Sequence, residues 1–400
     1  MQSFSLYQPT RLFFGDDQQA AFTEASAKLG KTALLLLGGG SLERLGYADR
    51  VTQAFEKQGV KVIRYKGIEP NPQAVTINKA AAQAKADGVE FVIALGGGSV
   101  MDAAKGIAVL LHEKADDIWP YCWGEPKDGQ FTGAVPLVCI PTTAATASEV
   151  TPYAVISHAP VKGKSGIASE HTKPLVSWLN PAFTTSVGAT TTADGGADIL
   201  SHVFEDYVTG NGASPIADLH SEMVMRMVIE TLPKALADLT NIDHRAILLW
   251  ASNLALNGYH LAGRVGGSFP MHAMEHALSG WQPDLAHGRG LASIFPAYFR
   301  WLHQQGRSHD RLARLGRVLF GVTDKEDDIA ALRFIERFTG WLRDNLLLQS
   351  LSSLGFHKAD YPAIAAYAVK VYGADGGIPA AGPLPAEGIV AIYEATEQNL

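Results

Sequence analysis

Two segments of the chain share one pattern, in which a short apolar run is followed by three glycines, a serine and a helical stretch. The two loops are Gly38, Gly39, Gly40 and Ser41 after residues 33–37, and Gly96, Gly97, Gly98 and Ser99 after residues 91–95. Glycines let a backbone approach a ligand closely, and serine is a favoured N-cap residue. The helix N-terminus that follows offers free N–H donors to a phosphate. The repeated pattern therefore predicts two phosphate-binding loops, as a dinucleotide requires.

The apolar runs of the first half indicate a parallel sheet. Runs of strand length occur at residues 33–37, 60–65, 91–95 and 135–140, and helical patterns lie between them, as at residues 43–58 and 73–85. Because the runs are continuously apolar, we expect strands buried on both faces, and strands that alternate with helices form parallel sheets. Ligands of such sheets bind at the carboxyl ends of the strands. Both glycine loops should therefore lie on the ligand-binding edge.

The second half has a different pattern, because strand-like runs nearly vanish and helical periodicity continues almost throughout. The predicted helices cover residues 193–208, 215–239 with a break at Pro233, 244–261, 271–279, 291–304, 328–347 and 388–398, the last after a loop at residues 375–387. We therefore expect two domains. Residues 1–187 should form an α/β dinucleotide-binding domain, and residues 188–400 an all-helical domain for metal and substrate.

Composition excludes several functional classes. Hydrophobic residues make up 47% and charged residues 18% of the 400 residues, which is enough apolar material for two domain cores. The formal net charge of −7 disfavours binding to nucleic acid or to an anionic membrane surface. The two cysteines make no disulfide framework. No apolar run reaches the length of a membrane span, and the N-terminus lacks a signal-peptide pattern. We therefore expect a cytoplasmic protein with no membrane or nucleic-acid partner.

The glycine loops depart from standard motifs. Neither matches the fingerprint G-x-G-x-x-G, since Met101 stands where the last glycine of the second loop is required. Residues 163–165 resemble the end of a P-loop, but His158 occupies the position of its first glycine. The alternative to phosphate binding is that the glycines merely end the strands. The occurrence of two equivalent loops disfavours this alternative. Residues 141–149, small and hydroxylated, fit either the lining of a ligand cleft or a threonine-rich turn.

Histidines and one carboxylate have the spacing of a metal site. Asp198 and His202 are four residues apart on a predicted helix and share one face. The same spacing joins His272 and His276, and His287 follows in a segment that we expect to be a loop. One carboxylate and three imidazoles suit a divalent transition metal. Such a centre keeps one net positive charge, which can polarise a carbonyl or hold an alkoxide. The candidate ligands are Asp198, His202, His272 and His287.

A different class of enzyme is also compatible with these histidines. Residues 272–276 match H-x-x-E-H, the inverted zinc-peptidase motif. In that interpretation His272 and His276 bind zinc and Glu275 is the general base. A match of this length arises readily by chance, and it leaves both glycine loops without a role.

Further motifs occur in one order along the whole chain. They are residues 7–11 with Phe14 and Gly15; residues 96–99 with Asp102 and Lys105; residues 142–149; Gly196, Asp198, His202 and Glu205; His272, His276, His287 and Gly288; and residues 383–393. In this order and spacing the chain resembles the iron-containing (group III) alcohol dehydrogenases over essentially its whole length. It is most similar to their butanol dehydrogenase and NADPH-dependent aldehyde reductase branch.

The resemblance implies an architecture like that of dehydroquinate synthase, with an α/β dinucleotide-binding domain, an all-helical domain and a cleft between them. It implies a metal-dependent alcohol dehydrogenase or aldehyde reductase that transfers hydride between a nicotinamide cofactor and a small alcohol or aldehyde. A homodimer is the implied assembly. Within the same fold, a glycerol-dehydrogenase-like polyol oxidoreductase or dehydroquinate-synthase-like chemistry is the alternative.

The resemblance also assigns roles to residues. Fe²⁺ or Zn²⁺ goes to Asp198, His202, His272 and His287, and His276 becomes a non-ligand active-site residue. The implied catalytic set is His276, His272 and Asp198. The cofactor-binding residues begin with the first glycine loop, Gly38, Gly39, Gly40 and Ser41. The resemblance places Gly97, Gly98 and Ser99 at the pyrophosphate of the cofactor, and Asp102, Thr142, Thr143 and Thr146 near the cofactor. It places Lys164 near the nicotinamide.

Some positions depart from the family pattern or bear on cofactor choice. Ala147 replaces a glycine, Asn180 replaces an aspartate, and the spacing from His272 to His287 is one residue longer than in many relatives. NAD-specific sites place a carboxylate on the ribose 2′-OH, but no acid occurs in the first loop before Glu43. Glycine and serine leave room for a 2′-phosphate that Arg44 or Lys66 would reach, so we predict NADP, with NAD as the alternative. An ordinary exposed helix position is an equally good interpretation of Arg44.

Overall fold

The computed structural model describes residues 1–399 and divides into two compact units. The α/β unit comprises Tyr7–Val187 with Thr240–Asn253, and the helical unit comprises Met1–Leu6, Gly188–Leu239 and the chain from Leu254 on. Residues 240–253 therefore belong to the α/β unit, although they follow the predicted boundary at residue 188. Contacts of α8 (Ile242–Ala255) explain this, because Trp250 packs edge-on against Phe14 and Asn253 donates a hydrogen bond to Glu149 at 3.0 Å.

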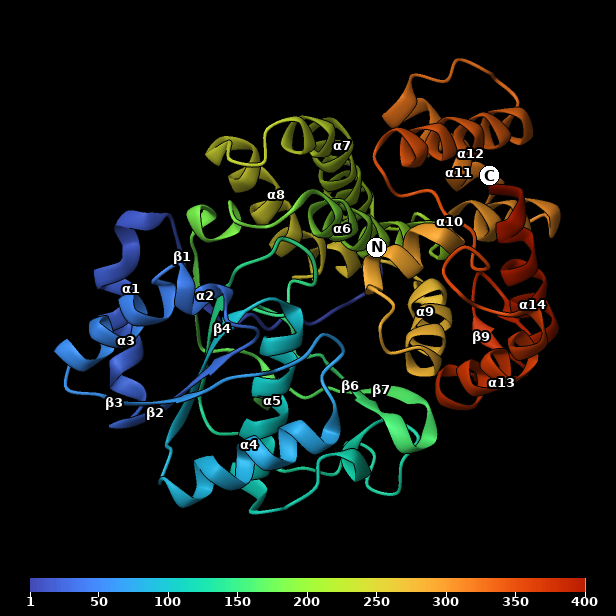
Figure 1. The fold of residues 1–400 in the computed structure, drawn as a ribbon. Helices are drawn as coiled ribbons and strands as arrows, with labels where there is room; N and C mark the ends of the chain where they lie inside the picture. Colours follow the sequence, from blue (N-terminus) through green and yellow to red (C-terminus); the bar gives the residue numbers. More distant parts are fainter. Residues whose placement is uncertain (400) are drawn as a thin grey trace. The chain divides into compact units, whose positions relative to one another are not determined.

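Six parallel strands form the sheet of the α/β unit (Figure 1). In spatial order they are β1 (Arg11–Phe14), β8 (Val176–Leu179), β5 (Leu137–Pro141), β4 (Phe91–Gly96), β2 (Thr32–Leu37) and β3 (Lys61–Tyr65). The four runs predicted as strands are β2, β3, β4 and β5, so the parallel sheet is confirmed. The edge strand β1 and its neighbour β8 were not predicted, since both are only four residues long.

Alternate side chains of the strands build two separate cores, one on each face of the sheet. Leu34 and Leu36 of β2 pack with α4 (Ala74–Ala86) and α5 (Gly98–Glu113). Leu35 and Leu37 pack on the opposite face with Phe22 of α1 (Gln19–Ser26) and Phe55 of α3 (Tyr47–Lys57). Because successive side chains of a strand point to opposite faces, a strand covered on both sides must be apolar at every position.

The strand order creates a switch point between β2 and β4. From β2 the chain passes to β3 on one side and then returns to β4 on the other side of β2. In open α/β sheets, ligands bind outside the carboxyl ends of the strands at such a point. Both glycine loops begin there, since residues 38–41 follow β2 and residues 97–99 follow β4.

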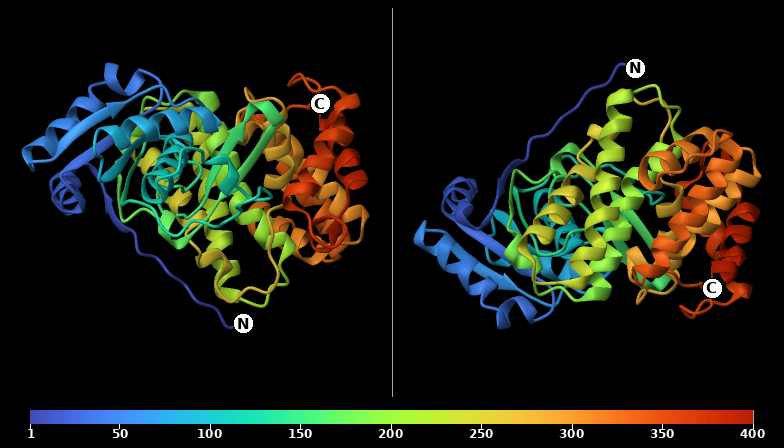
Figure 2. Two further views of the ribbon diagram at one scale, coloured as in Figure 1. Left: turned by 90° about the horizontal axis from the view of Figure 1, so that it is seen from below. Right: turned by 90° about the horizontal axis from the view of Figure 1, so that it is seen from above.

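Local departures from the predicted elements have identifiable causes. The helical pattern of residues 43–58 is split into α2 (Ser41–Arg44) and α3, because Gly46 adopts a left-handed conformation with φ 74°. An antiparallel pair, β6 (Ala154–His158) and β7 (Gly163–Ile167), was not predicted and forms a sheet of its own (Figure 2).

The helical unit is built around α6 (Ala189–Thr209) and α10 (His287–Gln304). Its other α-helices are α7 (Pro215–Ala237), α9 (Pro270–Trp281), α11 (His309–Phe320), α12 (Asp327–Asp344), α13 (Tyr361–Tyr372) and α14 (Ala386–Ala395). An aromatic cluster forms part of its core, in which Phe204 of α6 contacts Phe295 of α10 and Phe338 of α12. The predicted change from α/β to helical structure is confirmed.

Two helix boundaries were predicted wrongly. Pro233 does not break α7, which continues to Ala237. A proline lacks the N–H that would bind the carbonyl four residues before it, and here the Ile229 carbonyl accepts a hydrogen bond from the Trp341 indole at 3.1 Å instead. In addition, α8 ends at Ala255 rather than at residue 261, just before Gly258, where φ is 98°.

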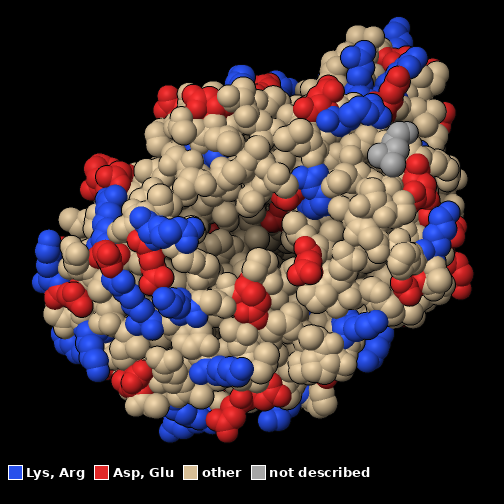
Figure 3. Space-filling model, viewed as in Figure 1, with Lys and Arg blue, Asp and Glu red and all other residues tan. Residues whose placement is uncertain are grey.

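The surface and the cysteines fit the expectations from composition. On the face in Figure 3, basic and acidic side chains of the described residues are interspersed, so that face presents no field of one sign. Cys122 and Cys139 are buried and free, and burial raises the pKa of the Cys139 thiol to about 12. Among residues 1–399, no helix is both long and apolar enough to cross a membrane.

Candidate functional site

The second glycine loop packs tightly against the threonine-rich loop that follows β5. A Cβ atom on Gly98 would lie 2.5 Å from Thr146 Cγ2, and one on Gly97 would lie 3.0 Å from Thr143 Oγ1. The Thr142 N–H donates to the Gly96 carbonyl at 3.0 Å. The glycines are therefore required by a close approach within the protein as well as by any ligand. The structure brings these predicted cofactor residues of the two loops together.

The predicted role of serine as a helix cap is wrong in both loops. The N-cap of α2 is Gly40 and that of α5 is Gly97, and neither helix has a side-chain cap hydrogen bond. Ser41 is the first residue of α2, and Ser99 is the second residue of α5. Because the glycines take the cap positions, the backbone N–H groups of these first turns are left for another acceptor.

Asp102 and Lys105 tie α5 to the segment after the threonine-rich loop. Asp102 accepts hydrogen bonds from Ser148 Oγ at 2.7 Å and from the Val155 N–H at 2.9 Å. The fully buried Lys105 donates to Ser148 Oγ at 2.7 Å and to the Tyr153 carbonyl at 2.6 Å. Burial lowers the pKa of Lys105, although Asp102 opposes this effect. Asp102 thus positions the wall of the predicted cofactor site.

The remaining predicted cofactor residues lie at the ends of neighbouring elements. Lys164 on β7 is buried and donates from Nζ to Asn71 Oδ1 at 2.9 Å. At the first glycine loop, a Cβ atom on Gly40 would lie 3.3 Å from Arg44 Nη1. Lys66 Nζ is 3.5 Å from Glu43 Oε2. Two cationic side chains and one carboxylate therefore surround this loop.

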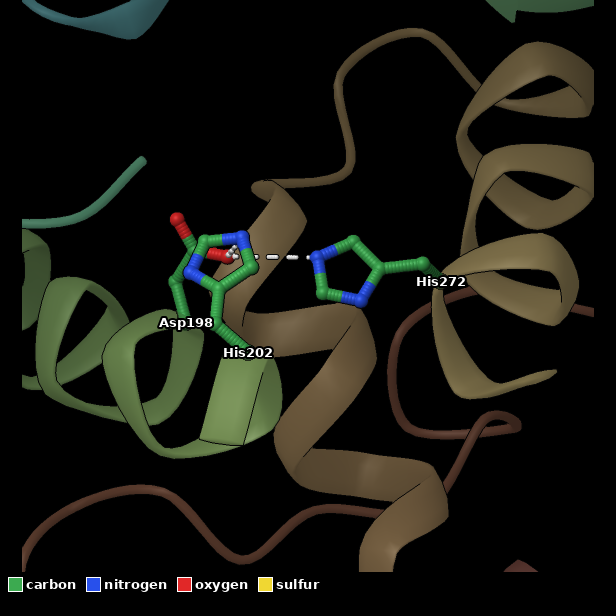
Figure 4. Close-up of side chains that lie close together, drawn as sticks. All are labelled: Asp198, His202 and His272. Atoms are coloured by element: carbon green, nitrogen blue, oxygen red, sulfur yellow. Dashed lines mark ion pairs between the residues drawn. The ribbon is translucent and has the colours of Figure 1, made fainter. Parts of the chain in front are cut away.

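Three helices of the helical unit bring the predicted metal ligands together. Asp198 and His202 lie on α6, His272 lies on α9, and His287 is the first residue of α10. Figure 4 shows the side chains of Asp198, His202 and His272 pointing toward one another. His287 was expected in a loop, which is wrong, because α10 already begins at this residue.

Asp198 Oδ1 is the centre of this group. It lies 3.6 Å from His202 Nε2, 3.7 Å from His272 Nε2 and 3.5 Å from His287 Nε2. Ligand atoms at about 2.1 Å from a tetrahedral ion lie about 3.4 Å apart. Each imidazole nitrogen thus lies from the carboxylate oxygen at about the separation of two ligands of one ion, and too far away for a hydrogen bond. The ligand atoms of Asp198, His202 and His272 also lie within 4.8 Å of one another.

Unsatisfied polar atoms show that this residue set fits a cation. Among residues 1–399, the buried atoms Asp198 Oδ1 and His272 Nε2 have no hydrogen-bond partner. Buried polar atoms in proteins are almost always hydrogen-bonded or bound to an ion. A divalent ion bound by Asp198, His202, His272 and His287 would satisfy them. The donor set, three nitrogens and one carboxylate, suits iron or zinc.

Two buried glutamates orient the imidazoles. Glu205 Oε1 accepts a hydrogen bond from His272 Nδ1 at 2.5 Å, and Glu275 Oε2 accepts one from His287 Nδ1. A proton held on Nδ1 leaves the Nε2 lone pair for a metal, and such carboxylate partners are typical of metal-binding histidines. Glu205 also accepts from the His272 backbone N–H at 3.2 Å, so it joins the start of α9 to α6.

The electrostatics favour positive charge at the centre. Burial alone would raise the pKa of Asp198, but the imidazole of His202 and its neighbours lower it well below its usual range. Burial lowers the pKa of His202 to about 3, so its ring is neutral. Burial also acts to lower the pKa of His272, but Glu205 and Asp198 raise it to about 10. The carboxylates on either side of His272 thus attract a cation to this position.

Gly288 allows α10 to begin against α6. A Cβ atom there would lie 1.9 Å from the Asp194 carbonyl oxygen. The neighbouring Arg289 pairs with the Asp194 carboxylate at 2.8 Å. Burial raises the pKa of Asp194 to about 6, against the opposing effect of Arg289. This contact brings His287 next to Asp198, since the two helices meet where each carries its ligand.

His276 lies beside His287, one of the candidate ligands. Its Nδ1 is hydrogen-bonded to the Tyr372 hydroxyl at 2.9 Å, and its ring stacks on His287 with centroids 5.3 Å apart. Glu275 is fully buried and holds His287, so it is not oriented as the general base of a peptidase. The geometry therefore disfavours the H-x-x-E-H interpretation.

Sequence reasoning missed several supporting residues. Glu205 appeared only as part of a motif, although it lies seven residues after Asp198 and hence on the same face of the helix. Glu275 was considered only as a peptidase base. Asp194 and Tyr372 had no signal at all, because their partners Arg289 and His276 are far away in the sequence.

Comparisons with known proteins agree with the motifs. Residues 9–181 match the family model described as iron-containing alcohol dehydrogenase, and residues 192–396 match the C-terminal model of that family. The chain is 36% identical over 346 residues to the probable NADH-dependent butanol dehydrogenase 1 of Bacillus subtilis. This alignment covers 85% of this chain and 87% of that protein.

A second relative and a solved structure extend this likeness. The NADPH-dependent aldehyde reductase YqhD of Escherichia coli is 32% identical over 328 residues, which is 82% of this chain and 83% of that protein. The crystal structure of NADH-dependent butanol dehydrogenase A from Thermotoga maritima matches with a TM-score of 0.92 at 29% identity, and it covers 99% of both chains. These matches confirm the predicted family, branch and fold class.

We predict that Glu205→Gln weakens metal binding about 10- to 100-fold, because the charged partner of His272 Nδ1 is lost. The Kd is measured by competition with a chelator. Glu222→Gln is the matched control, since Glu222 is also buried and bonded, to Tyr207 and Arg314 at 2.6 Å each. Equal losses in the two variants would contradict the orienting role of Glu205.

We also predict that Gly98→Ala destabilises the α/β unit by about 1–3 kcal/mol and weakens NADPH binding, because the new methyl group overlaps Thr146 Cγ2. The measurements are Tm and the Kd for NADPH. Removing the opposing methyl group with Thr146→Ser in the Gly98→Ala background should restore part of both. No restoration would mean that the clash is not the cause.

Proposed function

Because this chain belongs to the iron-containing alcohol dehydrogenase family, and is therefore an oxidoreductase that interconverts alcohols and aldehydes, we propose which of its residues perform the reaction. Asp198, His202, His272 and His287 hold one divalent ion. The observation that carries this assignment is the convergence of three imidazole nitrogens on Asp198 Oδ1 at 3.5 to 3.7 Å.

The reaction needs one electrophilic centre, one hydride and one proton. When bound, the divalent ion supplies Lewis-acid polarisation of the substrate oxygen, and the nicotinamide supplies or accepts the hydride. The protein residues keep the site prepared for this. Glu205 and Glu275 fix the tautomers of His272 and His287 through their Nδ1 atoms, so the ligand geometry needs no rearrangement during the reaction.

We assign the proton transfer to His276. Hydride addition to the carbonyl carbon leaves an alkoxide that requires one proton, and His276 is the ionisable side chain stacked on the ligand His287. Its hydrogen bond to the Tyr372 hydroxyl holds the ring in place. In the oxidation direction His276 takes the proton back. General acid–base catalysis of this kind contributes about 10²- to 10⁴-fold.

For the cofactor we propose NADP(H), bound at the switch point by the two glycine loops. The first turns of α2 and α5 offer their N–H groups to phosphate, and Asp102, Lys164 and the threonine-rich loop complete the site. Arg44 and Lys66 are the cations beside the first loop that would bind a 2′-phosphate. Relatives are named for both NADH and NADPH, and we assign the choice between the two cofactors in this chain to Glu43 and Arg44.

We further propose a cytoplasmic homodimer that acts on small alcohols and aldehydes. Support for an assembly comes from α7, where Ile216, Leu219 and Met223 are 68%, 60% and 44% exposed. Their spacing of three and four residues puts them on one helix face. Free buried cysteines are common in reducing compartments.

The principal test measures NADPH oxidation with butanal by metal-stripped enzyme, with and without Fe²⁺ or Zn²⁺, and with NADH as comparison. We expect metal-dependent oxidation that is faster with NADPH and absent in His287→Ala, whose metal content should fall. Glycerol with NAD⁺ tests the polyol alternative, and a peptide substrate tests the peptidase alternative. Metal-independent turnover would contradict the assigned centre, and faster NADH oxidation would contradict the cofactor assignment alone.

A separate prediction concerns the 2′-phosphate. Arg44→Ala should raise the KM for NADPH about tenfold and leave the KM for NADH unchanged, because a hydrogen bond between charged groups contributes about 1.5–3 kcal/mol. Steady-state kinetics with both cofactors measures this. Lys61→Ala is the control, since Lys61 is an exposed cation at the first residue of β3, away from the carboxyl end. Equal changes for NADH and NADPH would exclude a contact with the phosphate.

A further inference from the structure

A second cluster of metal-ligating side chains lies in the helical unit, outside the site described above. His303 is in the last turn of α10, His309 is the first residue of α11, and Asp328 is the second residue of α12. One ligand atom from each of the three residues lies within 4.8 Å of the other two. The proposed reaction uses none of them.

Asp328 Oδ1 is the point on which the two imidazoles converge. It lies 2.9 Å from His303 Nε2 and 3.8 Å from His309 Nδ1, and the two rings stack with centroids 4.5 Å apart. The closer contact lacks the geometry of a hydrogen bond, and within residues 1–399 the buried His303 Nε2 has no hydrogen-bond partner. A nitrogen and a carboxylate in this arrangement can share a cation that lies off the line between them.

The tautomer of His309 is determined by its other nitrogen. His309 Nε2 is 2.8 Å from the backbone carbonyl of His303, which can only accept a hydrogen bond. Nε2 therefore carries the proton, and in the neutral ring Nδ1 turns its lone pair toward Asp328 Oδ1. Two such electron-rich atoms repel unless a cation lies between them. A backbone carbonyl on the far nitrogen is also the usual support of a metal-binding histidine.

The two histidines, His303 and His309, are the only ion-pair partners of Asp328 among the described residues. Arg317 of α11 donates hydrogen bonds to Asp327, the residue before Asp328, at 2.8 Å and to two backbone carbonyls. Asp328 is 61% exposed at its side chain, so an ion can reach it from solvent.

We propose that His303, His309 and Asp328 bind a second divalent transition-metal ion in each chain. Two imidazole nitrogens and one carboxylate suit Zn²⁺, Ni²⁺ or Cu²⁺, whereas Mg²⁺ and Ca²⁺ prefer sites made of oxygen alone. The ion joins the end of α10 to the first turns of α11 and α12. Because α10 begins at His287, each end of this helix then carries a metal ligand. Its role is structural, in fixing the α11–α12 pair to α10.

The test adds Zn²⁺ or Ni²⁺ to the holoenzyme, whose catalytic centre is already filled. Equilibrium dialysis with elemental analysis should find one further ion per chain in the wild type and in His357→Gln, an exposed single histidine of the same unit. His303→Gln and His309→Gln should each lose this ion, while kcat with butanal stays unchanged in both. Added Zn²⁺ should raise Tm in the wild type and in His357→Gln only, and Mg²⁺ should have no effect.

Added Cu²⁺ gives an independent readout through electron paramagnetic resonance. The wild type and His357→Gln should show a Cu²⁺ signal with two coordinating nitrogens, and His303→Gln and His309→Gln should lose this signal. Unchanged metal content in both His303→Gln and His309→Gln would overturn the proposal, because the ion would then bind elsewhere. Failure of the wild type to bind a further ion would overturn it as well, and the cluster would be an ion pair between a protonated histidine and Asp328.

Discussion

The candidate metal centre of the helical unit is built around one buried carboxylate oxygen. Asp198 Oδ1 is surrounded by three imidazole nitrogens, and no hydrogen bond among the described residues satisfies it. Such a group is costly to bury alone and stable when it binds a cation. Its neighbourhood is arranged for that purpose. Glu205 and Glu275 turn the ligand histidines, and Gly288 lets α10 start against α6. We therefore expect substitutions at these supporting positions to act on the reaction through the candidate metal ligands.

The α/β unit depends on a comparable constraint of topology. The two glycine loops leave the adjacent strands β2 and β4, between which the direction of strand addition reverses. The backbone N–H groups of two helix starts therefore belong to one edge of the sheet. Gly97 and Gly98 also serve internal packing, because added Cβ atoms would lie 3.0 and 2.5 Å from side chains of the threonine-rich loop. The proposed phosphate binding and the internal packing use the same residues, so we expect these positions to be sensitive to substitution for two reasons.

Metal chemistry recurs at the other end of α10. The catalytic candidate and the proposed second site share one feature, because each has a carboxylate oxygen facing an imidazole whose far nitrogen is hydrogen-bonded within the protein, His272 in the first and His309 in the second. They differ in burial, since the Asp198 side chain is 3% exposed and that of Asp328 is 61% exposed. A buried centre excludes water and strengthens electrostatic interactions, as catalysis requires. An exposed centre allows its ion to exchange with solvent.

The sequence by itself determined the parallel sheet, the helical second half, the family and the identities of the four ligand candidates. These follow from apolar periodicity and from motif spacing, which are properties of neighbouring residues in the chain. Only the tertiary structure decided that Glu205 and Glu275 orient the ligands, that His276 meets Tyr372, and that Trp341 lets α7 pass Pro233. The reason is physical: each of these contacts joins residues that are distant in sequence, and hydrogen bonds between distant residues leave no periodic trace.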